Sequence, residues 1–79
     1  MNFGEALEHV KNGKRIARRN WNGKGQYVFL VKAEQLKHIA DKCQKVVDVL
    51  AICTTSDIIQ VGWLATQTDM LATDWYVVE

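Results

Sequence analysis

Two segments of this chain place a tryptophan among short polar residues. The first runs from Asn20 to Gly25 (Asn-Trp-Asn-Gly-Lys-Gly), and the second runs from Trp63 to Leu71 (Trp-Leu-Ala-Thr-Gln-Thr-Asp-Met-Leu). An indole ring can stack on a purine base, while backbone N–H groups and cationic side chains can bind phosphate oxygens. The two segments therefore favour a site that binds a nucleotide.

The candidate ligand-binding residues come from these two segments and from an arginine before the first. Both tryptophans are expected to sandwich or flank the base, and backbone N–H groups over residues 22–25 are expected to form a phosphate cradle. Nearby cations, Arg19 among them, would add charge to that cradle. The second segment opens a helix, where spare N–H donors and the helix dipole favour an anion. The full set is Arg18, Trp21, Asn22, Gly23, Lys24, Trp63, Thr66, Gln67, Thr68 and Asp69.

Each of these residues also has a structural interpretation. A tryptophan in so small a protein often lies in the core or in a subunit interface. Asp69 follows Thr66 at the third position, which is also the spacing of a helix capping box. The asparagines beside Trp21 suit a tight turn. The sequence leaves both interpretations open.

Residue patterns typical of catalysis are missing from the sequence. His9 and His38 each lie beside charged residues, and neither has a Ser or Cys in an elbow-like segment nearby. Asp69 and Asp74 are five residues apart, and neither has an apolar setting that would raise its pKa. The segment 23–25 lacks the Ser/Thr and the spacing of a Walker loop. We therefore expect a binding protein and not an enzyme, with no cofactor.

The two cysteines, Cys43 and Cys53, have no His/Cys partner at zinc-ligand spacing. No metal is therefore expected, and both cysteines are predicted to be packing residues of a reduced protein. The start of the chain, residues 1–5, lacks the charged leader and apolar run of a secretion signal. No apolar stretch approaches the roughly 18 residues of a membrane span. We expect a cytosolic protein with no membrane partner.

The charges are unevenly distributed although the net charge is only +1. So small a net charge argues against a general DNA-binding protein. Residues 46–79 carry five acidic residues and no Lys or Arg, while six basic residues lie within the first 24: Lys11, Lys14, Arg15, Arg18, Arg19 and Lys24. This asymmetry fits a positive field for an anionic ligand, and it fits equally well salt bridges between opposite ends of two subunits.

The pattern of residues predicts three short helices. Asn2 and Glu5 have the spacing of a capping box, and a helical apolar stripe follows until Asn12-Gly13. A helical period returns over residues 33–45, and a third helix begins after Thr66.

Strands are expected between the helices. The first is an edge strand because of its charges, the second has two apolar faces and so is central or covered on both sides, and the third and fourth form a hairpin. Their predicted ranges are 14–19, 26–32, 46–54, 58–61 and 75–78. Together these elements predict a single α+β domain over residues 1–79, with an antiparallel sheet of about four or five strands and two or three short helices. A chain of 79 residues is close to the lower limit for a stable core, so oligomerisation is expected to add stability.

Four stretches, 1–7, 13–15, 20–25 and 63–75, together resemble the second Thoeris anti-defence family of small phage proteins. The resemblance covers roughly residues 1–30 and 47–79. Residues 33–46 do not match in the same way, and Gly62 stands where the family usually has a proline.

The resemblance implies a molecular sponge that captures cyclic ADP-ribose isomers, the signals of bacterial Thoeris immunity, without cleaving them. It implies a homo-oligomer, a dimer of dimers with ligand pockets between subunits, in the host bacterial cytoplasm. Some members of the family are thought to accept cyclic dinucleotides too. Two alternatives remain: a protein–protein adaptor with tryptophan anchors, and a hydrolase of the signal.

Overall fold

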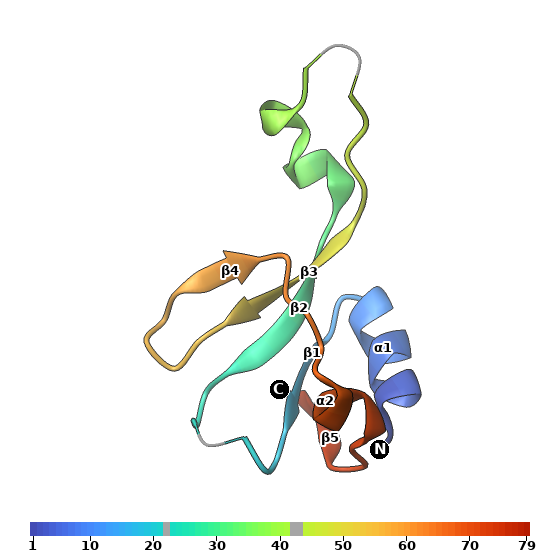
Figure 1. Cartoon of the computed structure of the whole chain (residues 1–79), viewed down its shortest axis with the longest axis vertical. Helices are drawn as coiled ribbons and strands as arrows, with labels where there is room; N and C mark the ends of the chain where they lie inside the picture. Colours follow the sequence, from blue (N-terminus) through green and yellow to red (C-terminus); the bar gives the residue numbers. More distant parts are fainter. Residues whose placement is uncertain (22, 42–43) are drawn as a thin grey trace.

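The computed structural model describes residues 1–21, 23–41 and 44–79 (Figure 1). It contains a five-stranded antiparallel sheet in the order β4-β3-β2-β1-β5 and two α-helices, which confirms the α+β class. The elements are α1 (Phe3–Lys11), β1 (Arg15–Arg18), β2 (Tyr27–Val31), the 3-10 turns η1 (Ala33–Gln35) and η2 (Lys37–Ile39), β3 (Val49–Cys53), β4 (Ile59–Val61), α2 (Gln67–Leu71) and β5 (Trp75–Val78). The predictions made for Asn22 and Cys43 fall outside the described residues.

Both α-helices begin with the capping boxes that the sequence predicts. At α1, the Asn2 side chain accepts a hydrogen bond from the Glu5 N–H at 2.8 Å, and the Glu5 carboxylate accepts one from the Asn2 N–H at 2.9 Å. At α2, the Thr66 hydroxyl accepts from the Asp69 N–H and the Asp69 carboxylate accepts from the Thr66 N–H, both at 3.1 Å. These reciprocal bonds satisfy N–H groups that a helix start otherwise leaves unpaired.

The prediction that the first strand lies at the edge of the sheet is wrong. β1 pairs with β2 at Ile16↔Val28 and with β5 on its other side, from Arg15↔Val78 to Arg18↔Trp75. The last strand returns from the far end of the chain and covers the edge that β1 would otherwise expose. β2 is central, as predicted, and β3 and β4 form the predicted hairpin.

The prediction of a regular helix over residues 33–45 is also wrong. After β2 the chain makes the two 3-10 turns and then returns to β3, which starts at Val49. We call residues 32–41 and 44–48 the arm, because they extend away from the sheet along the longest dimension of the molecule (Figure 1). An amphipathic helix of this length needs a surface to bury its apolar face. In the described part of the chain the arm lacks such a surface, and Ile39 is 66% exposed.

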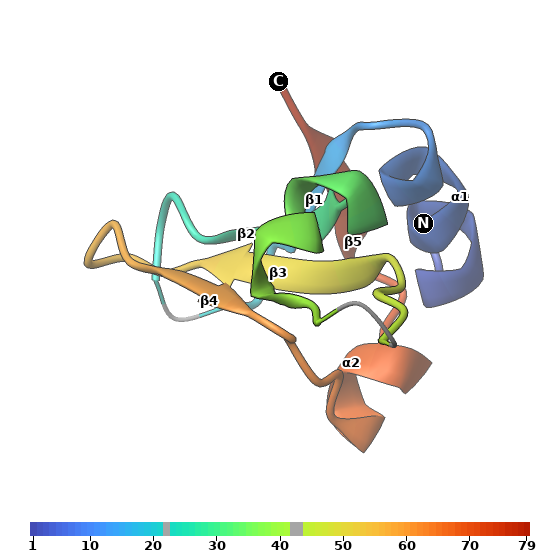
Figure 2. The ribbon, with the colours of Figure 1, turned by 90° about the horizontal axis from the view of Figure 1, so that it is seen from above.

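The core lies between the sheet and α1, and α2 joins it on the same side (Figure 2). Alternation along each strand sends every second side chain to this side of the sheet. The cluster of buried residues comprises Ala6, Val10, Ile16, Val28, Ile52 and Trp75.

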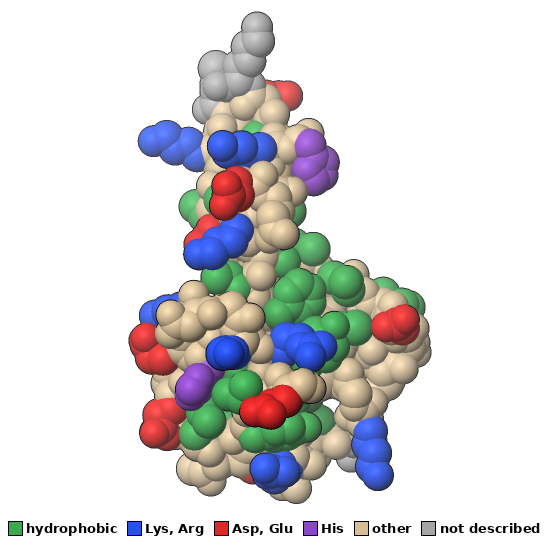
Figure 3. Space-filling model, turned by 180° about the vertical axis from the view of Figure 1, so that it is seen from behind, with side chains coloured by type: hydrophobic (Ala, Val, Ile, Leu, Met, Phe, Trp, Pro, Cys, Tyr) green, Lys and Arg blue, Asp and Glu red, His purple; other side chains and the backbone are tan. Residues whose placement is uncertain are grey.

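The opposite side of the sheet is not covered by either α-helix, and we call it the open face (Figure 3). Cross-strand partners lie on the same side of a sheet. The register therefore places on this face Ala17, Tyr27, Phe29, Ala51, Ile59, Val61, Tyr76 and Val78. Ile59 and Val61 are 57% and 54% exposed, so an apolar surface remains in contact with solvent. β2 thus has the two apolar faces that its sequence predicts.

Candidate ligand-binding site

All three tryptophans belong to one aromatic cluster. Trp75 is 2% exposed, and its ring centroid lies 5.2 Å from that of Phe3, 5.3 Å from that of Trp21 and 6.3 Å from that of Trp63. The rings of Trp21 and Trp63 are themselves 6.4 Å apart with an angle of 69° between their planes. Such edge-to-face contacts stabilise aromatic cores.

Within a single chain, this arrangement does not form the sandwich that is one of the two roles expected for the tryptophan pair. A base between two rings needs roughly parallel planes, whereas Trp21 and Trp63 contact each other edge to face within one chain. Both side chains are half-buried, so each still has an outer surface. A role at the flank of a ligand remains a prediction for both.

Asp69 lies at the centre of a polar network beneath the cluster. Its Oδ1 accepts a hydrogen bond from Arg18 Nη1 at 2.9 Å and another from Trp21 Nε1 at 3.2 Å. Its backbone carbonyl accepts a third from Trp75 Nε1 at 2.9 Å. The side chain is nearly buried, and Arg18 supplies the opposite charge that a buried carboxylate requires. Two of the three indole N–H groups are therefore held by this one residue.

Arg18 also links this network to Asp74, the residue directly before β5. Its Nε donates to Asp74 Oδ1 at 2.9 Å, and the second oxygen of Asp74 accepts from the Asn20 N–H at 2.9 Å. The hydrogen bonds that Arg18 donates to Asp74 and Asp69 raise the pKa of Arg18. This arginine is thus an ion-pair partner of two carboxylates within the fold, and its contact with a phosphate remains a prediction.

The two carboxylates should make the fold sensitive to acid. Burial by itself raises the pKa of Asp69, but hydrogen bonds from Arg18, Thr66 and Trp21 outweigh it and leave that pKa below its ordinary value. The pKa of Asp74 is lowered chiefly by Arg18. A lowered pKa gives stability that is complete above the ordinary value of about 4 and is lost as the pH falls through the lower, folded-state value.

We therefore expect the urea midpoint of unfolding to hold steady from pH 7 to about 5 and to fall below about pH 4. Asp69→Asn should have a lower midpoint at neutral pH and a weaker decline in acid. A wild-type midpoint that is the same at pH 3 and pH 6 would contradict this assignment.

A hollow of about 350 Å³ lies at the β1–β2 loop, residues 19–26. We call it the loop hollow. Within it the Arg19 guanidinium stacks over the Tyr76 ring, 4.5 Å from the centroid. None of the described residues that line the loop hollow is acidic; they are Arg18, Arg19, Trp21, Gly23, Lys24, Gly25, Gln26 and Tyr76. An aromatic ring, cations and loop backbone thus lie together at one end of the sheet.

The structure divides the predicted site residues into two groups. Arg18, Trp21, Gly23 and Lys24 line the loop hollow. Five others do not line it: Trp63, Thr66, Gln67, Thr68 and Asp69. The side chains of Thr66, Gln67 and Thr68 are exposed, and the Asp69 carboxylate itself occupies the start of the single-turn helix where an anion was expected.

Sequence reasoning missed two residues of the loop hollow, Gln26 and Tyr76. Tyr76 enters it because β5 pairs with β1, which places Tyr76 opposite Ala17. The alternation of β5 could have shown which side Tyr76 faces, but nothing in the sequence identifies β1 as its neighbour.

Gly23 holds the loop against the β3–β4 turn. A Cβ atom added at Gly23 would lie only 2.0 Å from Thr55 Cγ2 and 3.3 Å from Thr55 Cβ. Gly23 thus packs against Thr55, while the Asp69 network holds Trp21.

Gly23→Ala should accordingly destabilise the protein by about 1–3 kcal/mol, the usual cost of overpacking. The double variant Gly23→Ala/Thr55→Ser removes the colliding methyl group and should recover part of that loss. Thr55→Ser alone serves as the control, and denaturant melts of the four proteins supply the comparison. Equal losses in the single and double variants would rule out this contact as the cause.

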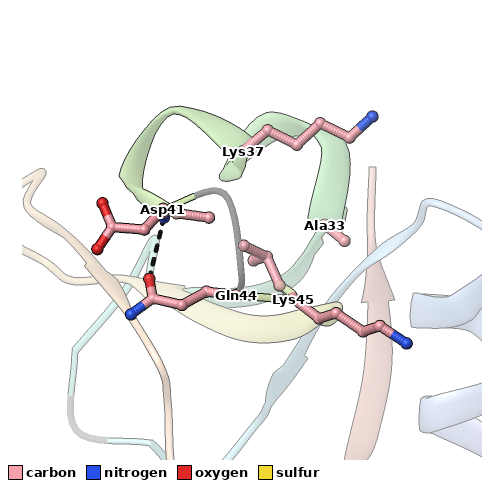
Figure 4. A pocket seen from close by; sticks show the side chains of 7 residues that line it. Ala33, Lys37, Asp41, Gln44 and Lys45 are labelled. Carbon is pink, nitrogen blue, oxygen red and sulfur yellow. Dashed lines mark hydrogen bonds between the residues drawn. The ribbon is translucent and has the colours of Figure 1, made fainter.

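Two further hollows lie along the arm. One of about 510 Å³ includes Lys37, Asp41 and Lys45, and a neighbouring one of about 530 Å³ is lined mainly by apolar residues such as Leu36 and Val61. In the first, the Asp41 N–H donates to Gln44 Oε1 at 3.0 Å, and the two lysine side chains extend away (Figure 4). None of the predicted site residues that the structure describes lines either hollow.

Over the described residues, no group of three or more His, Cys, Asp and Glu side chains is placed to hold a metal ion. In the same part of the chain, no helix has the length and apolar character needed to cross a membrane.

Comparison with known proteins places the chain in a family. The sequence model described as the Thoeris anti-defense 2-like domain matches residues 1–78. The chain belongs to this family. It is also similar to the protein called "Thoeris anti-defense 2" of Bacillus phage SP01, with 35% identity over an alignment of 85 residues that covers 99% of this chain and 94% of that protein.

The match to the Thoeris anti-defense 2-like domain confirms the resemblance found in the sequence. It extends across the arm, where the sequence segments themselves give no likeness, and across the β1–β2 loop, α2 and β5. Every element that builds the aromatic cluster and the loop hollow therefore lies within the family domain.

Proposed function

We propose that this protein is a phage anti-defence protein that acts in the host bacterial cytoplasm. In this proposal it binds cyclic ADP-ribose-type signals of Thoeris immunity and sequesters them without cleavage. Family membership and the name of the Bacillus phage relative support the anti-defence role. Cyclic dinucleotides are a second ligand class within the same proposal.

The choice of ligand rests on the residues that line the loop hollow. A cyclic ADP-ribose isomer presents an adenine, ribose hydroxyls and a pyrophosphate. Trp21 offers an aromatic surface, Arg19 and Lys24 offer positive charge, and Gln26 offers an amide for hydroxyl groups or the edge of the base. These chemical groups match the parts of the ligand one by one.

Size and energy both favour a pocket that is completed by another subunit. Ligand pockets usually measure about 300–1,000 Å³, so the loop hollow of about 350 Å³ is near the lower end of that range. One base stack contributes about 1–3 kcal/mol, whereas nanomolar affinity requires about 12 kcal/mol. A second subunit would add contacts and exclude water from the phosphate bonds.

The open face supports a homo-oligomer, which we propose is a dimer of dimers. Ile59 and Val61 leave an apolar surface on the sheet that no α-helix covers. A small domain gains stability when another copy covers such a surface. Native mass spectrometry should give the subunit number, and a monomer at micromolar concentration would contradict this part of the proposal.

Recovering the bound ligand distinguishes sequestration from cleavage. The protein is incubated with cyclic ADP-ribose isomers, freed of unbound ligand, and heated to release what it holds. Chromatography should then show the intact ligand in the amount bound. Fragments of the ligand would identify a hydrolase instead.

A thermal-shift assay distinguishes the sponge from a protein–protein adaptor. A ligand at 100 times its Kd stabilises the folded state by about 2.7 kcal/mol. Stabilisation by a cyclic ADP-ribose isomer or a cyclic dinucleotide supports the proposal. If none of these ligands shifts the melting temperature, the exposed apolar surface of the open face favours the adaptor.

Arg19 should provide a salt-dependent part of the affinity, because it lines the loop hollow and is exposed. We expect Arg19→Ala to weaken ligand binding more at 20 mM than at 500 mM NaCl, since salt screens exposed charges. Lys11→Ala removes the same charge from α1 and should leave the affinity as it is in the wild type. A loss that is equal at both salt concentrations would assign Arg19 to packing.

A further inference from the structure

The Asp69 carboxylate has no free side that faces the loop hollow. The residue is 7% exposed. One oxygen accepts from Arg18 and Trp21, and the other accepts from the Thr66 N–H. A residue committed to these partners is poorly placed to contact a ligand, although the sequence made it a candidate for that role.

The same contacts give Asp69 control over the side chain of Trp21, a residue that lines the hollow. The indole of Trp21 can turn about its side-chain bonds, and two features fix its orientation. Its N–H points to Asp69 Oδ1 at 3.2 Å, and its ring packs edge to face against Trp75 and Trp63. The backbone carbonyl of Asp69 also accepts a hydrogen bond from Trp75. A single residue thus fixes the orientation of two indole rings of the cluster.

We propose that Asp69 is a positioning residue: it sets the orientation of Trp21 for the ligand and makes no ligand contact of its own. This inference rests on the proposed function for its ligand. Its physical content, that Asp69 fixes Trp21, is also testable without any ligand.

The role requires a carboxylate and not merely a residue of similar size. Asp69 accepts three side-chain hydrogen bonds and donates none through its side chain. An asparagine has one accepting oxygen and an NH₂ group that is only a donor. In Asp69→Asn the NH₂ must therefore face the N–H of Thr66 or the N–H groups of Arg18 and Trp21. One side of the network is lost in either orientation.

The test is a double-mutant cycle measured by calorimetry with cyclic ADP-ribose isomers and cyclic dinucleotides as probes. Asp69→Asn should weaken binding, and by no more than Trp21→Ala does, because its effect on the ligand passes through Trp21. In the Trp21→Ala background the same change should have little further effect, since residues that act through one another are not additive. Glu8→Gln, an equivalent change of charge at an exposed position of α1, should bind like the wild type.

Full additivity of the two losses would overturn the inference, because it would mean an independent contact between Asp69 and the ligand. Wild-type affinity in Asp69→Asn would overturn it as well. Trp21→Phe offers a route that leaves Asp69 intact: it keeps an aromatic ring but lacks the N–H donor. It should bind more weakly than the wild type, and unchanged affinity would count against the role of this hydrogen bond.

A second measurement needs no ligand. In ¹H–¹⁵N spectra, the indole resonance of Trp21 is assigned by its loss in Trp21→Phe. In Asp69→Asn it should shift and its hydrogen should exchange faster, while backbone resonances of β1 and β2 remain. A Trp21 resonance that stays in place would overturn the inference. If the wild type binds none of the probes, the proposed function fails, and this spectrum alone decides whether Asp69 positions Trp21.

Discussion

Arg18→Met is expected to lower the free energy of unfolding by about 3–5 kcal/mol, the cost of removing one partner from a buried ion pair. Arg18 Nη1 lies 2.9 Å from Asp69 and Arg18 Nε lies 2.9 Å from Asp74. Without the guanidinium, the nearly buried Asp69 carboxylate loses its charge partner. A domain of 79 residues has a total free energy of unfolding of about 4–12 kcal/mol. The variant should therefore lose a large part of its stability and be more often unfolded at 37 °C.

The matched control for Arg18→Met is Arg19→Met, which removes the neighbouring arginine. Arg19 is exposed and stacks on Tyr76, and its loss should change stability by less than about 1 kcal/mol. Urea denaturation at one fixed protein concentration compares the two, because assembly makes stability depend on concentration. Equal midpoints for the two variants would show that the buried ion pairs do not hold the fold.

Trp21→Ala is expected to weaken the binding of a cyclic ADP-ribose isomer by about 1–3 kcal/mol, or roughly 5- to 150-fold, because it removes one of the two aromatic side chains among the lining residues of the loop hollow. Trp21→Phe should give an intermediate loss. Trp21 also packs on Trp75, so the variant loses some stability, and calorimetry should be done well below its melting temperature.

Trp63→Phe is the control for the aromatic cluster, since Trp63 contacts Trp21 and Trp75 but does not line the loop hollow. It should lose stability with a smaller loss of affinity than Trp21→Ala. Unchanged affinity in folded Trp21→Ala would remove Trp21 from the binding site, and a greater loss of affinity in Trp63→Phe would move the site to the other side of the cluster.

Features set by neighbouring residues could be predicted from the sequence. The capping boxes of Asn2 with Glu5 and of Thr66 with Asp69 both form. Their hydrogen bonds join residues only three positions apart, so the spacing of residue types is sufficient to identify them. The central position of β2 and the β3–β4 hairpin follow in the same way from the alternation of side chains and a short turn.

Features set by contacts between distant segments could not be predicted from the sequence. β1 is central because β5 pairs beside it. Nothing in the local sequence of β1 identifies β5 as its partner. The same pairing brings Tyr76 to the loop hollow and Arg18 to its two carboxylates. The arm has the period of a helix, but the described residues offer no surface on which that helix could bury its apolar face. The segment forms two 3-10 turns instead.

By itself, the sequence determined the α+β class, the starts of both α-helices and the presence of Trp21 among groups suited to a nucleotide. Only the tertiary structure decided that Asp69 and Arg18 form a nearly buried network and that Trp21 and Trp63 contact each other edge to face within one chain. The physical reason is the range of the interactions. Caps and alternation depend on residues a few positions apart, whereas Asp69 meets Arg18 across 51 positions, and only packing of the whole chain brings them together.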